Sequence, residues 1–356
     1  MERIWAVGYK SALWFELVTY SISLPLEVYL IACLRKSSLL HGNLKIMMIN
    51  LCVTMIVFAL SHIGMYIDSE LQLLGVGVDN IACRFAQGFF RVTFDCATNM
   101  TGIWMMLFTA ERAIATCVPQ SYEKKKEMKR VTLTIASLWT VSLAIAAVSW
   151  FLFHVRVDSC IPTTSPPSSS FIYANHIAMI LLAGIALFGV TFAACFLITL
   201  LCRNIKQRKR CDIGQLNLRY QYSENIFTIR FLMPITALYA VLLLFCIFCL
   251  IMYHLERHSP NENTVKLLFY EKSLFASISF FSIAYPFICF LMHRPIRDKV
   301  SSDLCFLAKV LRSDSKQKGT TTVVVRSVSG KQLCFKDETS MYFTHLNTFW
   351  NVNNKH

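Results

Sequence analysis

The sequence lacks the short motifs that mark the common enzyme classes. It has no Walker loop for nucleotide phosphates, no metal box and no nucleophile elbow, and no set of Cys and His residues has closed zinc spacing. It also lacks an inverted repeat and matching pairs of Gly- or Pro-broken apolar segments, which are typical of transporters. We therefore predict no reaction centre, no metal site and no cofactor.

Charged residues are scarce and apolar residues abundant. Hydrophobic residues make up 55% of the 356 residues, and the mean hydropathy is +0.49. Soluble domains usually contain about 45–50% apolar residues, so this composition indicates a multi-pass membrane protein. The formal charge of +14 does not require a nucleic-acid partner, because the basic residues lie in short segments between apolar runs.

Seven apolar runs are each long enough to cross about 30 Å of hydrocarbon as a helix. The first is the least regular, because it contains Glu16, Pro25 and Glu27. We predict an all-α membrane protein in which residues 12–292 form a seven-helix bundle. The predicted spans cover about 12–34, 44–67, 84–110, 131–153, 171–202, 231–254 and 270–292.

Seven spans place the two termini on opposite sides of the membrane. Of the 35 Lys and Arg residues, 27 lie in the segments after the first, third and fifth spans and in the tail. Seven lie in residues 1–11 and in the segments after the second, fourth and sixth spans, and Arg91 lies inside the third span. Basic residues concentrate on the cytoplasmic side, so residues 1–11 are predicted to be extracellular, with no removable signal peptide. We expect residues 293–312 to form an amphipathic helix on the inner leaflet, and residues 313–356 to form a disordered cytoplasmic tail.

Cysteine positions agree with this topology. Cys83 opens the third span and Cys160 follows the fourth, so both face the oxidising exterior. A disulfide between them is predicted, and two unpaired thiols are the alternative.

Three polar residues recur within the third span. Arg91, Asp95 and Asn99 are four residues apart and share one helix face. Ionisable residues inside a membrane normally face the bundle interior. The set is either part of a ligand pocket or an internal ion pair that fixes helix packing.

The third span ends in a charge pair, Glu111 and Arg112, followed by basic residues from Lys124 to Arg130. Because a central charge is costly and a terminal one can reach water, the pair marks the cytoplasmic membrane face. In the segment before the sixth span, Leu216, Tyr220 and Phe227 have helical spacing, which predicts that this span extends into the cytoplasm.

Two segments resemble a known family. Residues 216–225 read Leu-x-x-Arg-Tyr-Gln-x-x-Glu-Asn, which resembles a signature of the nematode chemoreceptors allied to serpentine receptor class alpha. Residues 111–116, followed by Tyr122-Glu123-Lys124-Lys125, look most like class epsilon within that superfamily. The resemblance covers about residues 10–300. It implies a G-protein-coupled receptor in the plasma membrane of sensory neurons that senses an external small molecule and activates a heterotrimeric G protein.

The resemblance also implies roles for individual residues. Arg112 corresponds to the arginine that, in such receptors, holds the inactive state and contacts the G protein. Glu111 corresponds to the acidic residue next to that arginine. The seventh span contains Tyr285-Pro286 but no Asn-Pro-x-x-Tyr motif. We therefore assign no switch residues in this span by comparison with rhodopsin-like receptors. A multi-pass channel or transporter is the alternative function. The residues expected to line the cytoplasmic mouth are Arg219, Tyr220, Gln221, Glu224 and Asn225.

Overall fold

The computed structural model describes residues 2–37, 41–73, 80–118, 128–154, 170–211, 216–259 and 263–311. These residues form eight helices and no strand. The helices are α1 (Glu2–Lys36), α2 (Gly42–Leu73), α3 (Asn80–Cys117), α5 (Met128–His154), α6 (Ser170–Arg210), α7 (Leu216–Arg257), α8 (Thr264–Met292) and α9 (Arg294–Leu311). The chain divides into two compact units, Met1–Leu304 and Cys305–His356, and the bundle belongs to the first.

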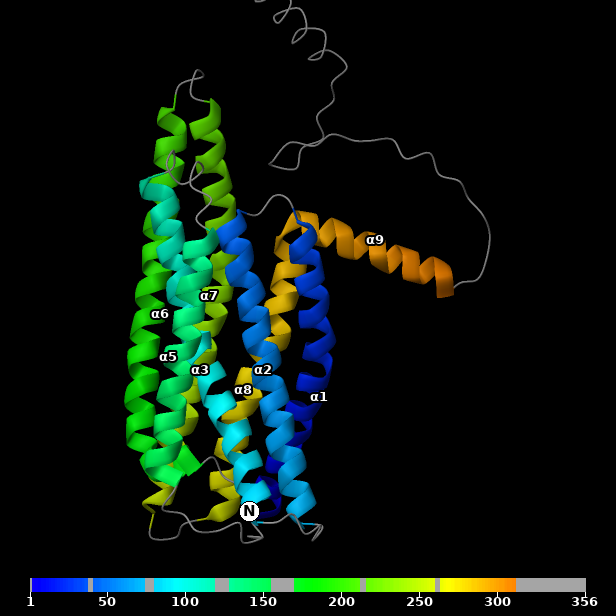
Figure 1. The fold of residues 1–356 in the computed structure, drawn as a ribbon, viewed down its shortest axis with the longest axis vertical. Helices are drawn as coiled ribbons and strands as arrows, with labels where there is room; N and C mark the ends of the chain where they lie inside the picture. The colour runs from blue at the N-terminus through cyan, green and yellow to red at the C-terminus, as the bar shows by residue number, and fades with distance from the viewer. Residues whose placement is uncertain are drawn as a thin grey trace, which may run out of the picture. The chain divides into compact units, whose positions relative to one another are not determined.

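Seven helices, α1 to α8, run side by side along the long axis of the bundle (Figure 1). Six of them are long and apolar enough to cross a membrane by length and composition: α1, α2, α5, α6, α7 and α8. The remaining helix, α3, is less uniformly apolar because it carries Arg91, Asp95, Glu111 and Arg112. It contacts α2, α5, α6 and α7, so it lies among the other helices. A helix surrounded by protein can carry polar groups that a lipid-facing helix cannot. The predicted all-α seven-helix bundle is therefore confirmed.

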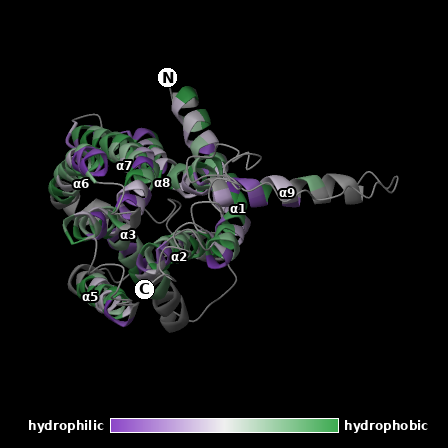
Figure 2. Ribbon diagram, turned by 90° about the horizontal axis from the view of Figure 1, so that it is seen from above, coloured by the Kyte–Doolittle hydropathy of each residue, from purple (hydrophilic) through white to green (hydrophobic). Residues whose placement is uncertain are grey.

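The helices that face outward are apolar on their exposed surfaces. On α6, Ile185 and Phe188 are largely exposed, as are Leu133 and Phe151 on α5. Figure 2 views the bundle from above and shows hydrophobic colouring along α5, α6 and α7. Such a surface suits contact with lipid chains, because lipid is as apolar as the side chains themselves.

The buried core has two clusters. One surrounds the fully buried Trp104, whose Nε1 donates to Thr54 Oγ1 at 2.9 Å. The other lies among α1, α2, α3, α7 and α8 and includes Tyr20, Phe58 and Phe94. The indole hydrogen bond satisfies the one polar atom that Trp104 brings into the core.

Several helices extend beyond the predicted spans. α1 begins at Glu2 rather than near residue 12, and α6 continues to Arg210. α7 begins at Leu216, so the predicted helical extension of the sixth span is confirmed. Helical hydrogen bonding continues into water where residues of good helix propensity follow the apolar stretch. Pro234 and Pro286 lie inside α7 and α8 without ending either helix.

The end of α8 leads directly into α9. The His293 N–H donates to Cys289 O at 3.1 Å and closes α8, while His293 O accepts from Arg297 N at 2.9 Å and starts α9. Tyr29 Oη on α1 donates to Asp303 Oδ2 on α9 at 2.7 Å. We call this side of the bundle, where α3 and α8 end and α7 begins, the Arg112 end. The opposite side is the Arg91 end.

Candidate functional site

Arg112 lies in the last two turns of α3 and is 1% exposed. Its neighbour Glu111 is 7% exposed. A buried guanidinium needs hydrogen-bonded acceptors, because an uncompensated charge inside a protein costs several kcal/mol. The protein supplies these acceptors from two helices.

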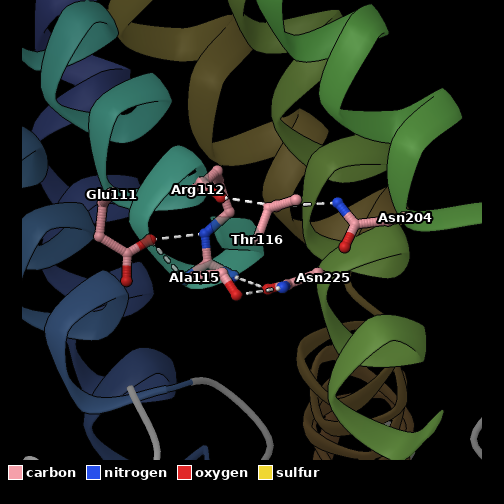
Figure 3. Close-up of polar contacts among 6 residues, drawn as sticks. All are labelled: Glu111, Arg112, Ala115, Thr116, Asn204 and Asn225. Atoms are coloured by element: carbon pink, nitrogen blue, oxygen red, sulfur yellow. Dashed lines mark hydrogen bonds and ion pairs between the residues drawn. The ribbon is translucent and has the colours of Figure 1, made fainter. Parts of the chain in front are cut away.

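Glu111 provides the first acceptor. Arg112 Nε donates to Glu111 Oε2 at 2.5 Å, and Arg112 Nη2 contacts the same oxygen (Figure 3). Adjacent residues on a helix do not face each other, so the two side chains must turn toward one another to meet. Two charge-assisted contacts on one oxygen neutralise the guanidinium locally.

Asn225 on α7 provides the second acceptor. Arg112 Nη1 donates to Asn225 Oδ1 at 3.0 Å, and Asn225 Nδ2 donates to Ala115 O at 3.1 Å (Figure 3). Ala115 lies in the final turn of α3, where carbonyl groups have no acceptor role within the helix. One side chain of α7 therefore holds both the arginine and the end of α3.

Asn204 on α6 joins this site and was not predicted from the sequence. Its Nδ2 donates to Thr116 Oγ1 at 2.8 Å, and Thr116 Oγ1 donates to Arg112 O at 2.8 Å (Figure 3). The same Nδ2 also donates to Leu200 O at 2.8 Å. Asn204 is fully buried although the adjacent Arg203 is exposed. The only sequence signal is an uncharged amide inside a basic run. We call Glu111, Arg112, Thr116, Asn204 and Asn225 the Arg112 cluster.

The other predicted residues of the cytoplasmic mouth lie on the first turns of α7. Arg219 and Tyr220 are exposed, whereas Gln221 and Glu224 are partly buried. The structure therefore brings Asn225 to Arg112 and leaves Arg219 and Tyr220 on the surface.

At the other half of α3, Arg91 and Asp95 form a pair. Arg91 Nε lies 3.3 Å from Asp95 Oδ2, and the guanidinium carbon lies 5.9 Å from the centre of the Phe94 ring. The Arg91 side chain is 8% exposed and the Asp95 side chain 22%. Asn99 is exposed, and within the described part of the chain no hydrogen bond joins it to this pair.

A buried acid and imidazole pair near Arg91 was also not predicted. Glu16 Oε1 on α1 lies 2.9 Å from His62 Nδ1 on α2, and both side chains are buried. The His62 ring contacts the rings of Tyr20, Phe94 and Phe275. The sequence shows each ionisable residue in its own apolar run, but it does not show that the two runs pack together.

The predicted disulfide lies outside what the structure describes. Cys160 is not among the described residues, and the Cys83 side chain is not described either. His254 on α7 and His258, just beyond the end of that helix, are four residues apart, and their ring centres lie 4.4 Å apart. Within the described residues, no group of three or more His, Cys, Asp or Glu side chains could hold a metal ion.

The comparison with protein families agrees with this architecture. Residues 8–313 match the family described as serpentine type 7TM GPCR receptor class ab chemoreceptor. No curated protein matches the chain. The matched class is ab, so the predicted assignment to class epsilon is not confirmed. The broader assignment to the nematode chemoreceptors is confirmed. This family consists of receptors and is not an enzyme family. The chain therefore belongs to the class ab serpentine chemoreceptors, a family of multi-pass G-protein-coupled receptors.

Proposed function

We propose that this receptor detects an external small molecule and activates a heterotrimeric G protein at the Arg112 end. The observation that carries the proposal is the Arg112 cluster, in which a buried arginine on α3 is held by an amide on α7. Family membership supports a chemosensory role. The excess of basic residues in the segments at the Arg112 end supports a cytoplasmic location for that end. We place the receptor in the plasma membrane of sensory neurons.

The Arg112 cluster has the properties of a two-state element. In the held arrangement, Asn225 joins α7 to α3 through Arg112 and Ala115. A shift of α7 breaks both bonds together, because the Asn225 side chain accepts one of them and donates the other. Arg112 can then turn toward a partner protein. An agonist that binds this second arrangement more tightly shifts the population toward it.

The energy required is modest. A shift from about 1% to about 99% released needs about 5.5 kcal/mol of differential agonist affinity. A net hydrogen bond contributes about 1 kcal/mol, and bonds to charged groups contribute about 1.5–3 kcal/mol. Two bonds from Asn225, one of them to a guanidinium, are therefore of the right size for a switch that a ligand can overcome.

We place the ligand at the Arg91 end. Arg91 and Asp95 offer a hydrogen-bond donor and an acceptor, and the Asp95 side chain retains some exposure. Phe90 lies on the same helix, is partly exposed and offers apolar contact area. Such a site would suit a small molecule that has both polar and apolar parts.

The test is nucleotide exchange on a co-reconstituted G protein, driven by pooled nematode small molecules. We expect exchange with the intact receptor and none with Arg112→Ala, while ligand binding survives in both. The matched control is Arg35→Ala, which removes an exposed arginine at the end of α1 on the same side of the bundle. This variant should behave like the intact receptor.

Two results would contradict the proposal. A folded receptor that binds the pool but drives no exchange would exclude coupling to the G protein used, and a ligand-evoked conductance in its place would favour the channel or transporter alternative. Loss of exchange in both arginine variants would show that Arg112 has no special role.

A further inference from the structure

His293 is a buried histidine at the Arg112 end, at the junction of α8 and α9. It is 1% exposed, and neither ring nitrogen has a hydrogen-bond partner among the described residues. A buried polar atom without a partner is costly, so its retention calls for a reason. The Arg112 cluster does not use it.

The imidazole packs against two phenylalanine rings of α7. Its ring centre lies 5.9 Å from that of Phe227 and 5.8 Å from that of Phe231. These residues are one helical turn apart, so they present their rings on the same side of α7. His293, Phe227 and Phe231 form a contact that we call the His293 wedge.

The same turn of α7 contacts α3. Asn225, which holds Arg112, lies two residues before Phe227, so the two side chains point to nearly opposite sides of the helix. α7 is thus held on one side by α3 and on the other by the α8–α9 junction. It cannot withdraw from Arg112 toward His293 without displacing the imidazole, and it cannot slide sideways without uncovering it.

We propose that the His293 wedge is a proton-dependent lock. The neutral imidazole keeps the Asn225–Phe231 segment of α7 in place, and protonation of the imidazole releases that segment. The proton that binds is the regulatory ligand, and the site is the ring of His293. The lock itself does not depend on the proposed function. Only its consequence does, namely that release of α7 promotes coupling to a G protein.

The electrostatics support this direction. Burial lowers the pKa of His293 to about 4, and no charged neighbour contributes to the shift. Among the side chains that the structure describes, the charged residues nearest in sequence to His293 and Phe231 are Arg230 on α7 and Arg297 and Asp298 on α9, and all three are exposed. Cys289 on α8 meets His293 through its backbone carbonyl. A ring uncovered to water regains a pKa of about 6.5.

The sign of the effect follows from proton linkage. Between about pH 4 and about pH 6.5 the uncovered ring binds a proton and the buried ring does not, so acidity favours the released arrangement. Lowering the pH from about 7.5 to about 5.5 should raise the ratio of released to held receptor about tenfold.

The experiment measures the position of α7 directly, without a G protein. Spin labels are placed through non-natural amino acids at exposed Arg219 on α7 and exposed Arg35 on α1, so that the native cysteines remain. The distance distribution of the full chain in lipid nanodiscs is recorded at both pH values. We expect the tenfold population shift in the wild type and in His258→Phe, which alters an exposed histidine, and no shift in His293→Phe.

A second measurement keeps the test independent of that variant. The protonation of the His293 ring is followed by NMR in the wild-type chain. A ring that protonates with no accompanying change in the α7 distance would overturn the proposal, as would a shift that persists in His293→Phe. A pH-dependent α7 shift without nucleotide exchange would support the lock and refute the proposed coupling.

Discussion

The two acid–base pairs of α3 differ in how they connect to the rest of the bundle. Arg91 and Asp95 are four residues apart and bond only along their own helix within the described part of the chain. Arg112 pairs with Glu111 and also bonds Asn225 on α7. A pair confined to one helix is insensitive to helix movement, whereas a pair tied to a second helix must change when that helix shifts.

From this difference we propose different roles for two chemically similar pairs. The Arg112 pair is suited to report the relative position of α3 and α7. The Arg91 pair has no cross-helix bond to lose among the described residues, so its polar atoms are available to an incoming ligand. Substitutions at the two ends should therefore separate basal signalling from agonist potency.

The largest effect is expected for Glu111→Ala. This change removes the carboxylate that Arg112 Nε and Nη2 both contact, and breaking a buried ion pair costs about 3–5 kcal/mol. The held arrangement should weaken, so agonist-independent nucleotide exchange should rise more than tenfold and the unfolding temperature should fall. Asp95→Ala is the matched control at the other pair and should not raise basal exchange. An equal rise in both variants would remove the distinction between the pairs.

Asn225→Ala should have the next largest effect. It deletes the bonds to Arg112 and to Ala115, at a cost of about 1–3 kcal/mol. Basal exchange should rise about tenfold while the level of folded receptor stays close to normal. The control is Asn99→Ala, which shortens an exposed amide on α3. Unchanged basal exchange in Asn225→Ala would mean that the bridge between α3 and α7 does not restrain activation.

Acidity should affect stability through His293 at the Arg112 end. The pKa of His293 is lowered to about 4 in the fold and is about 6.5 in the unfolded chain. The stabilisation is therefore complete at a pH well above about 6.5 and is lost as the pH falls toward about 4, with about 1.4 kcal/mol lost by about pH 5.5. The measurement is the unfolding temperature of the wild type and of His293→Phe between these pH values. The same acid sensitivity in both proteins would assign it to another group.

Substitutions of the outer pair should change potency rather than basal signalling. Asp95→Asn and Arg91→Gln should each raise the agonist concentration for half-maximal exchange about tenfold, equivalent to about 1.4 kcal/mol. Receptor at the cell surface is counted in parallel. Loss of surface receptor without a change in potency would show that Arg91 and Asp95 form a structural pair, the alternative that the sequence leaves open.

The smallest effect is expected for Asn204→Leu. The variant loses the hydrogen bonds of Asn204 Nδ2 to Thr116 Oγ1 and to Leu200 O, while Thr116 keeps its bond to Arg112 O. We expect a loss of about 1 kcal/mol and an increase in basal exchange of a few fold. Thr199→Val, on an exposed part of the same helix, is the control for a lost polar group. An effect larger than that of Asn225→Ala would place the main restraint on α6.

The sequence by itself determined the fold class, because the hydrocarbon thickness of a membrane requires long apolar helices and these are visible as runs. It also predicted a charge pair near the end of the third helix, although α3 runs on to Cys117, and a helix from Leu216 onward. It did not determine the receptor class, since the motifs around Arg112 and Asn225 indicated class epsilon, whereas the matching family is class ab.

Only the tertiary structure decided which polar residues meet. Asn225 reaches Arg112 over 113 positions of sequence, and Glu16 reaches His62 across two helices. Asn204 and His293 stand beside charged residues in the sequence, yet both are buried. A helical run fixes the angle between neighbouring side chains but not the rotation of one helix against another. That rotation is set by packing, and with it the identity of each buried partner.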